Sequence, residues 1–137
     1  MRIRPAGLAL STLGLALSLL AVEASSIPMR NVRVTERGAT AAARMDVFLP
    51  PSARYCHGFV RSYLLAAGPD RWYVIGRYGR FRVNFRPCID GEYDQESVSV
   101  RFRDTGGGLR RICFEAWTPL ASSRVSRHFA CTADFRS

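Results

Sequence analysis

The sequence predicts an α+β fold in which one amphipathic helix packs on an antiparallel sheet of about five strands, held together by two disulfides. Three observations predict this class. Apolar residues first recur at helical spacing and later alternate with polar residues at the period of two that is typical of strands. Four cysteines follow, and an even number in an exported chain predicts two disulfides with three possible connectivities: Cys56, Cys88, Cys113 and Cys131.

The first 24 residues are typical of a signal peptide. Two arginines precede an apolar stretch over residues 6–20, and Val22 and Ala24 occupy the small-residue positions before a signal peptidase cut. A signal anchor is the alternative interpretation, although the stretch is short for a membrane span and no other segment approaches twenty apolar residues. We therefore expect a secreted, extracellular protein without stable membrane insertion.

The rest of the chain is expected to divide into an N-terminal arm and one domain. Residues 25–49 contain a short strand around Val32 and Val34, and this arm need not be fully ordered. Residues 50–137 form the single disulfide-stabilised α+β domain. A chain of this length can bury a core without a metal, and the sequence leaves the oligomeric state open.

The helix is predicted over residues 53–67. Ser52 can cap its amino end, and Gly68 with Pro69 supplies a stop. Apolar residues recur between these signals at offsets of 0, 3, 4, 7, 8 and 11, which form one face of a helix. The residues on this face are Cys56, Phe59, Val60, Tyr63, Leu64 and Ala67.

Strands are predicted in the second half of the chain, where the apolar period becomes two. Residues 71–77 and 80–86 are expected to form a hairpin around Tyr78 and Gly79. A turn is expected over 104–108, which is rich in glycine. The further strands are predicted over 97–103, 110–117 and 124–132.

Every cation in the chain is an arginine, and the formal net charge is +9. Codon bias in a GC-rich genome, which favours arginine over lysine codons, explains this composition. The alternative is a secreted protein that ends its path inside another cell, where lysine is the usual ubiquitin acceptor.

Alternation predicts an arginine comb on two of the strands. If strands 80–86 and 97–103 are neighbours, their guanidinium groups share one face and form an anion-binding or nucleic-acid-binding patch. A solvated face that keeps a basic protein soluble is the alternative. The residues of this comb are Arg80, Arg82, Arg86, Arg101 and Arg103, with Tyr78 close by in sequence.

No cofactor or metal is expected. The acidic run 90–96 resembles the start of a calcium loop, but Gln95 and Arg101 stand where such a loop needs glycine and glutamate. His57, Glu115 and His128 are the residues with an acid–base character, and two histidines with a glutamate could cleave RNA. We expect binding rather than catalysis, with a ribonuclease-like activity as the enzymatic alternative.

The predicted architecture resembles the small secreted fungal ribonucleases and the ribonuclease-like effectors built on that fold. The residues that carry the resemblance are Tyr55, Cys56, Gly58, Ala66, Ala67, Gly68, His128, Phe129 and Cys131. The first sheet strand lacks a Tyr-Pro-His sequence, and residues 97–103 contain no glutamate. The resemblance therefore implies a catalytically inert relative that binds its target.

Three functions follow as expectations. The first is a secreted virulence effector that binds a host macromolecule and suppresses or triggers host immunity, since the chain is similar in its general features to the small cysteine-containing effectors of plant-pathogenic fungi. The second is a secreted binder of RNA or of a phosphate-bearing surface, or a ribonuclease-like toxin. The third is an extracellular inhibitor or binding subunit that recognises a protein. Partners are thus a host protein or an anionic macromolecule, met outside the producing cell or after translocation into a host cell.

Overall fold

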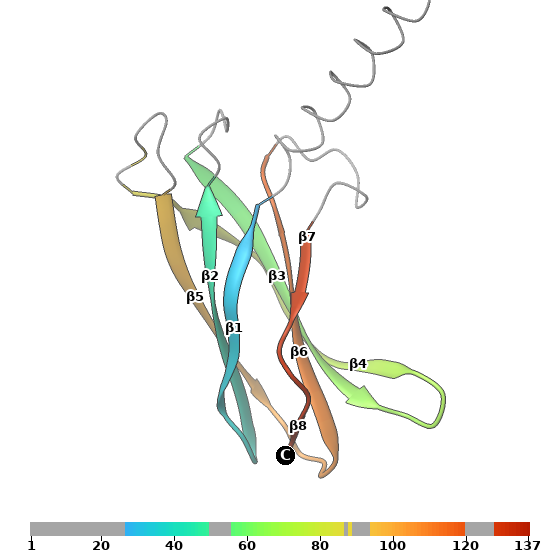
Figure 1. Cartoon of the computed structure of the whole chain (residues 1–137). Coiled ribbons are helices and arrows are strands. Elements are labelled where there is room, and N and C mark those ends of the chain that lie inside the picture. The colour runs from blue at the N-terminus through green and yellow to red at the C-terminus, as the bar shows by residue number, and fades with distance from the viewer. Residues whose placement is uncertain (1–26, 50–55, 87, 89–93, 120–127) are drawn as a thin grey trace, which may run out of the picture.

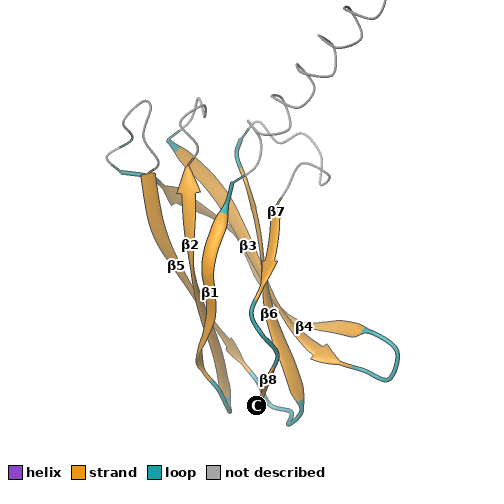
Figure 2. Ribbon diagram, in the orientation of Figure 1, coloured by secondary structure: helices purple, strands orange, loops and turns teal. Residues whose placement is uncertain are grey.

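The computed structural model describes residues 27–49, 56–86, 88, 94–119 and 128–137, and their regular structure consists entirely of strands (Figures 1 and 2). The strands are β1 (Met29–Glu36), β2 (Thr40–Leu49), β3 (His57–Ala67), β4 (Trp72–Asn84), β5 (Asp94–Arg103), β6 (Leu109–Trp117), β7 (His128–Cys131) and β8 (Phe135–Arg136).

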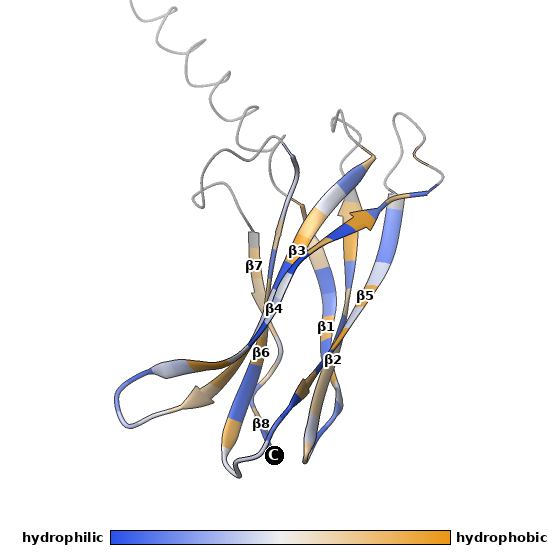
Figure 3. Cartoon of the chain, turned by 180° about the vertical axis from the view of Figure 1, so that it is seen from behind, coloured by the Kyte–Doolittle hydropathy of each residue, from blue (hydrophilic) through white to orange (hydrophobic). Residues whose placement is uncertain are grey.

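Two antiparallel sheets enclose the core. Sheet B has the strand order β1-β2-β5, and sheet A has the order β4-β3-β6-β7, with β8 paired to β6. Figure 3 shows hydrophilic and hydrophobic residues alternating along the strands, which is the pattern of sheets with one buried face. The core residues come from the inner faces of both sheets and include Met45, Val47, Val60, Leu64, Val98, Val100, Ile112, Phe114 and Phe135.

The predicted helix over 53–67 is wrong. Residues 57–67 form β3, with Val60, Ser62 and Leu64 buried on its inner face. The outer face of this strand also carries the large apolar side chains of Phe59 and Tyr63. Apolar residues on both faces of the strand together match the spacing of one helical face, which explains the wrong prediction. Residues 53–55 lie outside the described part of the chain. In the part of the chain that the structure describes, the α+β class is therefore replaced by an all-β arrangement of two sheets.

The predicted hairpin around Tyr78 and Gly79 is also wrong, because β4 continues through both residues. Val60 pairs with Phe81 and Ser62 pairs with Tyr78, so two residues of β4 oppose one residue of β3. This is a β-bulge, and a glycine inside a strand is typical of one. The actual turn of the hairpin lies between β3 and β4, where the amide of Gly68 donates to the carbonyl of Arg71.

Residues 27–49 belong to the body of the fold rather than to a separate arm. They supply β1 and β2, and β2 contributes four side chains to the hydrophobic core. The predictions for 97–103, 104–108 and 110–117 are confirmed by β5, a loop and β6. Of the predicted strand 124–132, residues 128–131 form β7 and residues 124–127 lie outside the description.

The two predicted disulfides are present. Cys56 is bonded to Cys88, which joins the start of β3 to the segment after β4, and their Cα atoms are 5.6 Å apart. Cys113 is bonded to Cys131 across the neighbouring strands β6 and β7, with Cα atoms 4.0 Å apart. Two disulfides are compatible with an extracellular protein, as the sequence predicts.

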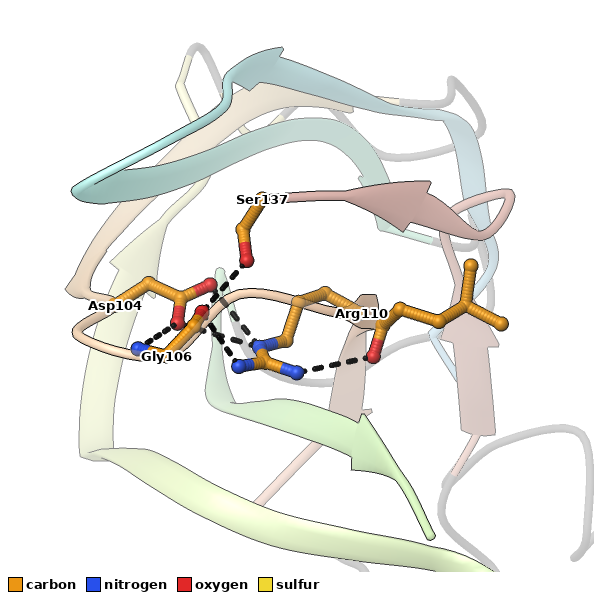
Figure 4. A network of polar contacts seen from close by, with 5 residues as sticks. Asp104, Gly106, Arg110 and Ser137 are labelled. Atoms are coloured by element: carbon orange, nitrogen blue, oxygen red, sulfur yellow. Dashed lines mark hydrogen bonds and ion pairs between the residues drawn. The ribbon is translucent and has the colours of Figure 1, made fainter.

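A buried ion pair closes the loop between β5 and β6 (Figure 4). The Arg110 Nε donates to both carboxylate oxygens of Asp104, at 3.1 and 3.3 Å, and another guanidinium nitrogen donates to the carbonyl of Gly106. The hydroxyl of Ser137 donates to the same carbonyl. The chain end is thereby held against this loop, and these contacts serve the fold rather than a binding surface.

Candidate functional site

The fold separates the arginines of the predicted comb. β4 belongs to sheet A and β5 to sheet B, and the two strands are not paired. Arg82 lies opposite Phe59 on the outer face of sheet A, whereas Arg101 lies opposite Ala42 in sheet B. One guanidinium nitrogen of Arg101 donates to both carboxylate oxygens of Glu36, at 2.8 and 3.1 Å. Arg101 is therefore neutralised by an exposed ion pair.

The remaining predicted residues are placed as follows. Arg86 lines a shallow pocket together with Arg82, at the junction of the two sheets. Arg103 lines another pocket with Arg101, of about 660 Å³, beside the loop that follows β5. Tyr78 packs edge-on against Phe102, with ring centroids 6.2 Å apart, although 48% of its surface is exposed. The six residues therefore do not form one patch.

A different cluster lies on the outer face of sheet A, and we call it the arginine–aromatic face. It consists of Arg61, Arg77, Arg80, Arg82, Phe59 and Tyr63. Phe59, Arg61 and Tyr63 alternate with the buried residues of β3, and Arg77 and Arg82 lie opposite Tyr63 and Phe59 on β4. Arg80 belongs to the β4 bulge and lies over the Phe59 ring. Arg77 and Arg82 face Tyr63 and Phe59, so the four arginines occupy about 13 Å along the sheet at a rise of about 3.3 Å per residue.

Two of these arginines lie over aromatic rings. The guanidinium carbon of Arg80 is 4.9 Å from the centre of the Phe59 ring, and that of Arg61 is 5.7 Å from the centre of the Trp117 ring. Such cation–π contacts hold a guanidinium group flat while leaving its N–H edge able to donate. The face is therefore partly preorganised for an anion.

Two carboxylates border the face, because Glu96 lines a pocket with Arg82 and Glu115 lies opposite Arg61 in the pairing of β3 with β6. None of the ion pairs between described residues involves its four arginines. The carboxylate of Glu115 lies on the same side of the sheet but is buried, and it accepts a hydrogen bond of 2.9 Å from the hydroxyl of Tyr63. A pocket of about 370 Å³ opens between Arg61, Arg77 and the β4 bulge. This pocket can accept a phosphate or a carboxylate group through the two guanidinium groups.

The three residues with acid–base character are not brought together in the described part of the chain. His57 and Glu115 are separated by four residue positions along the sheet, or roughly 13 Å. The Phe59 ring stands next to His57, 5.6 Å away between centroids. Burial, and then the charge of Arg82, hold the pKa of His57 below 6.5. The backbone of His128 pairs with Ala116, and its side chain lies outside the description.

Neither a metal site nor a membrane span is found in the described residues. They contain no group of three or more metal-ligating side chains and no long apolar helix that could cross a bilayer. Most of the acidic run 90–96 lies outside them, because the description resumes at Asp94.

Arg61 and Arg77 were missed by the sequence analysis. Arg61 falls within the predicted helix 53–67, and Arg77 ends the predicted strand 71–77. The signal for both was present, because Phe59, Arg61 and Tyr63 alternate with Val60, Ser62 and Leu64 at the period of a strand.

Comparison with known proteins identifies no family. No protein-family model matches the sequence, and none of the curated proteins matches it. Among solved structures, β-glucosidase 3B from Thermotoga neapolitana in complex with α-D-glucose is similar over 82% of this chain and 17% of its own, with 9% identity and a TM-score of 0.48. A hypothetical protein from Pyrococcus horikoshii is similar over 82% of this chain and 88% of its own, with 12% identity and a TM-score of 0.39. The ASH / PapD-like domain of human CEP192 is similar over 81% and 84%, with 14% identity and a TM-score of 0.36. These likenesses carry no functional argument.

Proposed function

We propose that this protein is a secreted effector that acts by binding, and that the arginine–aromatic face holds an anionic group of its macromolecular target. The observation that carries the proposal is the set of four outward guanidinium groups, of which two lie over aromatic rings and none is ion-paired within the described residues. Folding does not require such a concentration of like charges, whereas recognition of phosphate or carboxylate uses it directly.

The biological setting that we propose is host colonisation. The signal-peptide pattern of residues 1–24 and the two disulfides support a place outside the producing cell. The absence of lysine supports a later stage inside a host cell, where the protein would suppress or trigger immunity as a virulence factor.

The binding surface is tested by retention on three immobilised polyanions, namely RNA, heparin and polyglutamate, over a salt series. The variant Arg61→Ala/Arg77→Ala/Arg82→Ala removes three charges from the face and keeps Arg80 over the Phe59 ring. The matched control Arg37→Ala/Arg44→Ala/Arg136→Ala removes three exposed charges elsewhere. We expect the face variant to lose retention, with a salt slope on RNA that falls by about 2, while the control stays close to wild type.

Two results would contradict the proposal. Equal losses in both triple variants would show that retention depends on net charge alone. Cleavage of the RNA during incubation would contradict a purely binding role. The host setting is tested separately by expressing residues 25–137 inside host cells. Unchanged immune responses there would reject the effector role without touching the binding result.

A further inference from the structure

An apolar pocket adjoins the arginine pocket on the same face of sheet A. It measures about 290 Å³ and is lined by Tyr63, Leu65, Val74, Cys113, Glu115 and Phe129. Val74 and Phe129 form exposed parts of its wall, with 44% and 55% of their surfaces accessible. Large apolar side chains grouped at an exposed pocket are typical of an interaction site.

We propose that the two pockets together bind an extended acidic peptide segment of a partner protein. An apolar side chain of the segment occupies the apolar pocket, and a carboxylate two residues along the segment occupies the arginine pocket. This inference rests on the proposed function and names the class of partner that the face recognises.

The spacing of the pockets fits an extended peptide. Tyr63 is an outward residue of β3 and lines both pockets, so the two pockets are adjacent on this face. Side chains at positions i and i+2 of an extended chain project to the same side about 7 Å apart. One such step carries a ligand from the Leu65–Val74 pair of facing residues to the Tyr63–Arg77 pair, which lines the arginine pocket.

The charges fix which group enters which pocket. The Glu115 carboxylate lines the apolar pocket and accepts the hydroxyl proton of Tyr63 in a hydrogen bond. A ligand carboxylate there would meet no cationic side chain among the lining residues, whereas Arg61 and Arg77 attract it in the neighbouring pocket. The apolar side chain and the acid of the peptide therefore have one favoured order of docking.

The apolar pocket also favours a peptide over a nucleic acid. Phosphate groups would satisfy the arginine pocket equally well. A nucleobase in the apolar pocket, however, would leave several of its polar edge atoms without partners among mainly apolar walls, which is unfavourable. A leucine or phenylalanine side chain has no such atoms and gains from burial there.

The experiment uses the oxidised protein and fluorescent ten-residue peptides whose glutamate stands two positions after a leucine. Comparison peptides replace the leucine by alanine, or place the leucine directly beside the glutamate. The variant Val74→Ser/Phe129→Ser removes the apolar walls. The matched control Tyr73→Ser/Ile75→Ser changes the two exposed residues on either side of Val74 in β4, neither of which lines the pocket. Binding is followed by fluorescence anisotropy at low salt.

We expect the leucine peptide to bind about tenfold more tightly than either comparison peptide, which is the order of effect for burying one such side chain. Val74→Ser/Phe129→Ser should abolish this preference and leave retention on polyglutamate unchanged, and the control should keep both. Intact retention without a leucine preference, or a preference for RNA over the peptide, would overturn this inference alone. If the wild-type protein is retained on none of the three polyanions, the proposed function is overturned as well.

Discussion

Arg110 reaches back across the loop between β5 and β6 and binds Asp104, with Nε 3.1 Å from Oδ2. The side chains of both residues are almost fully buried, at 8% and 0% exposure. The other guanidinium nitrogens donate to the carbonyls of Leu109 and Gly106, so the charge is surrounded by acceptors. A buried pair of this kind stabilises the fold only while both partners are present.

Replacing Asp104 by alanine should therefore destabilise the protein by about 3–5 kcal/mol, because it leaves the Arg110 charge buried without its counter-ion. The comparison is Arg101→Ala, which breaks the exposed pair with Glu36 and should cost less than about 1 kcal/mol. Urea unfolding of the oxidised protein measures both. Similar losses in the two variants would contradict the structural role of the buried pair.

Ser62→Ala should leave stability unchanged or raise it by about 1 kcal/mol. The Ser62 hydroxyl is buried in the core and has no hydrogen-bond partner among the described residues, so its removal relieves a desolvation cost. Thr132→Val is the contrasting variant, because the buried Thr132 hydroxyl accepts a hydrogen bond of 3.1 Å from the amide of Ile112. Thermal unfolding should show a loss in the second variant only. A clear loss in Ser62→Ala would contradict this account.

The stability of sheet B should depend on acid pH through Asp46. Hydrogen bonds from Asn31 and then Ser97 hold the pKa of its carboxyl below the ordinary 3.8. The unfolded chain therefore binds this proton more readily than the folded chain. The resulting stabilisation is complete above the ordinary pKa and is lost as the pH falls from 3.8 through the folded value.

Ser97→Ala should raise the pKa of Asp46 and reduce this acid-side dependence. An NMR titration of the Asp46 carboxyl, with unfolding measured over about pH 2–6, tests both effects. Ser99→Ala is the control, since Ser99 is exposed on the same strand and lies opposite Arg44 rather than Asp46. An identical Asp46 titration in the two variants would reject the hydrogen bond from Ser97 as a cause.

His57 should titrate below its ordinary pKa of 6.5, chiefly because it is partly buried and secondly because Arg82 repels the imidazolium. Since the folded state binds this proton less readily, the associated stability is present above 6.5 and declines as the pH falls through that value toward the folded pKa. Arg82→Ala should raise the pKa only in part, because burial is the larger cause. NMR titration of the imidazole C–H protons measures it, and the same response in Arg37→Ala would exclude a local charge effect.

β5 was predictable because its outer face is polar and its inner face is apolar. In β5, Ser99 and Arg101 alternate with Val98 and Val100, and this period of two predicts a strand and not a helix. β3 differs because both of its faces carry apolar residues, with Phe59 and Tyr63 outside and Val60 and Leu64 inside. Periodicity alone therefore could not separate a strand from a helix there, and its aromatic and β-branched content was the better signal.

The candidate site was predictable in kind but not in membership. Alternating arginines indicated an anion-binding face, and Arg80 and Arg82 are indeed on the arginine–aromatic face. Local spacing, however, does not say which strands become neighbours, because pairing is a long-range property of the chain. β5 pairs with β2 rather than β4, so Arg101 meets Glu36 while Arg61 takes a place beside Arg77.

The bond between Cys113 and Cys131 has a consequence for how two molecules can meet. β7 has four residues and occupies the edge of sheet A among the described strands. A short edge strand can leave its own sheet and be replaced by the same strand of another copy. Because a covalent link fastens β7 to β6, such an exchange requires reduction first. Exchange of β7 between two copies is therefore blocked in an oxidising medium. It becomes possible only in a reducing compartment.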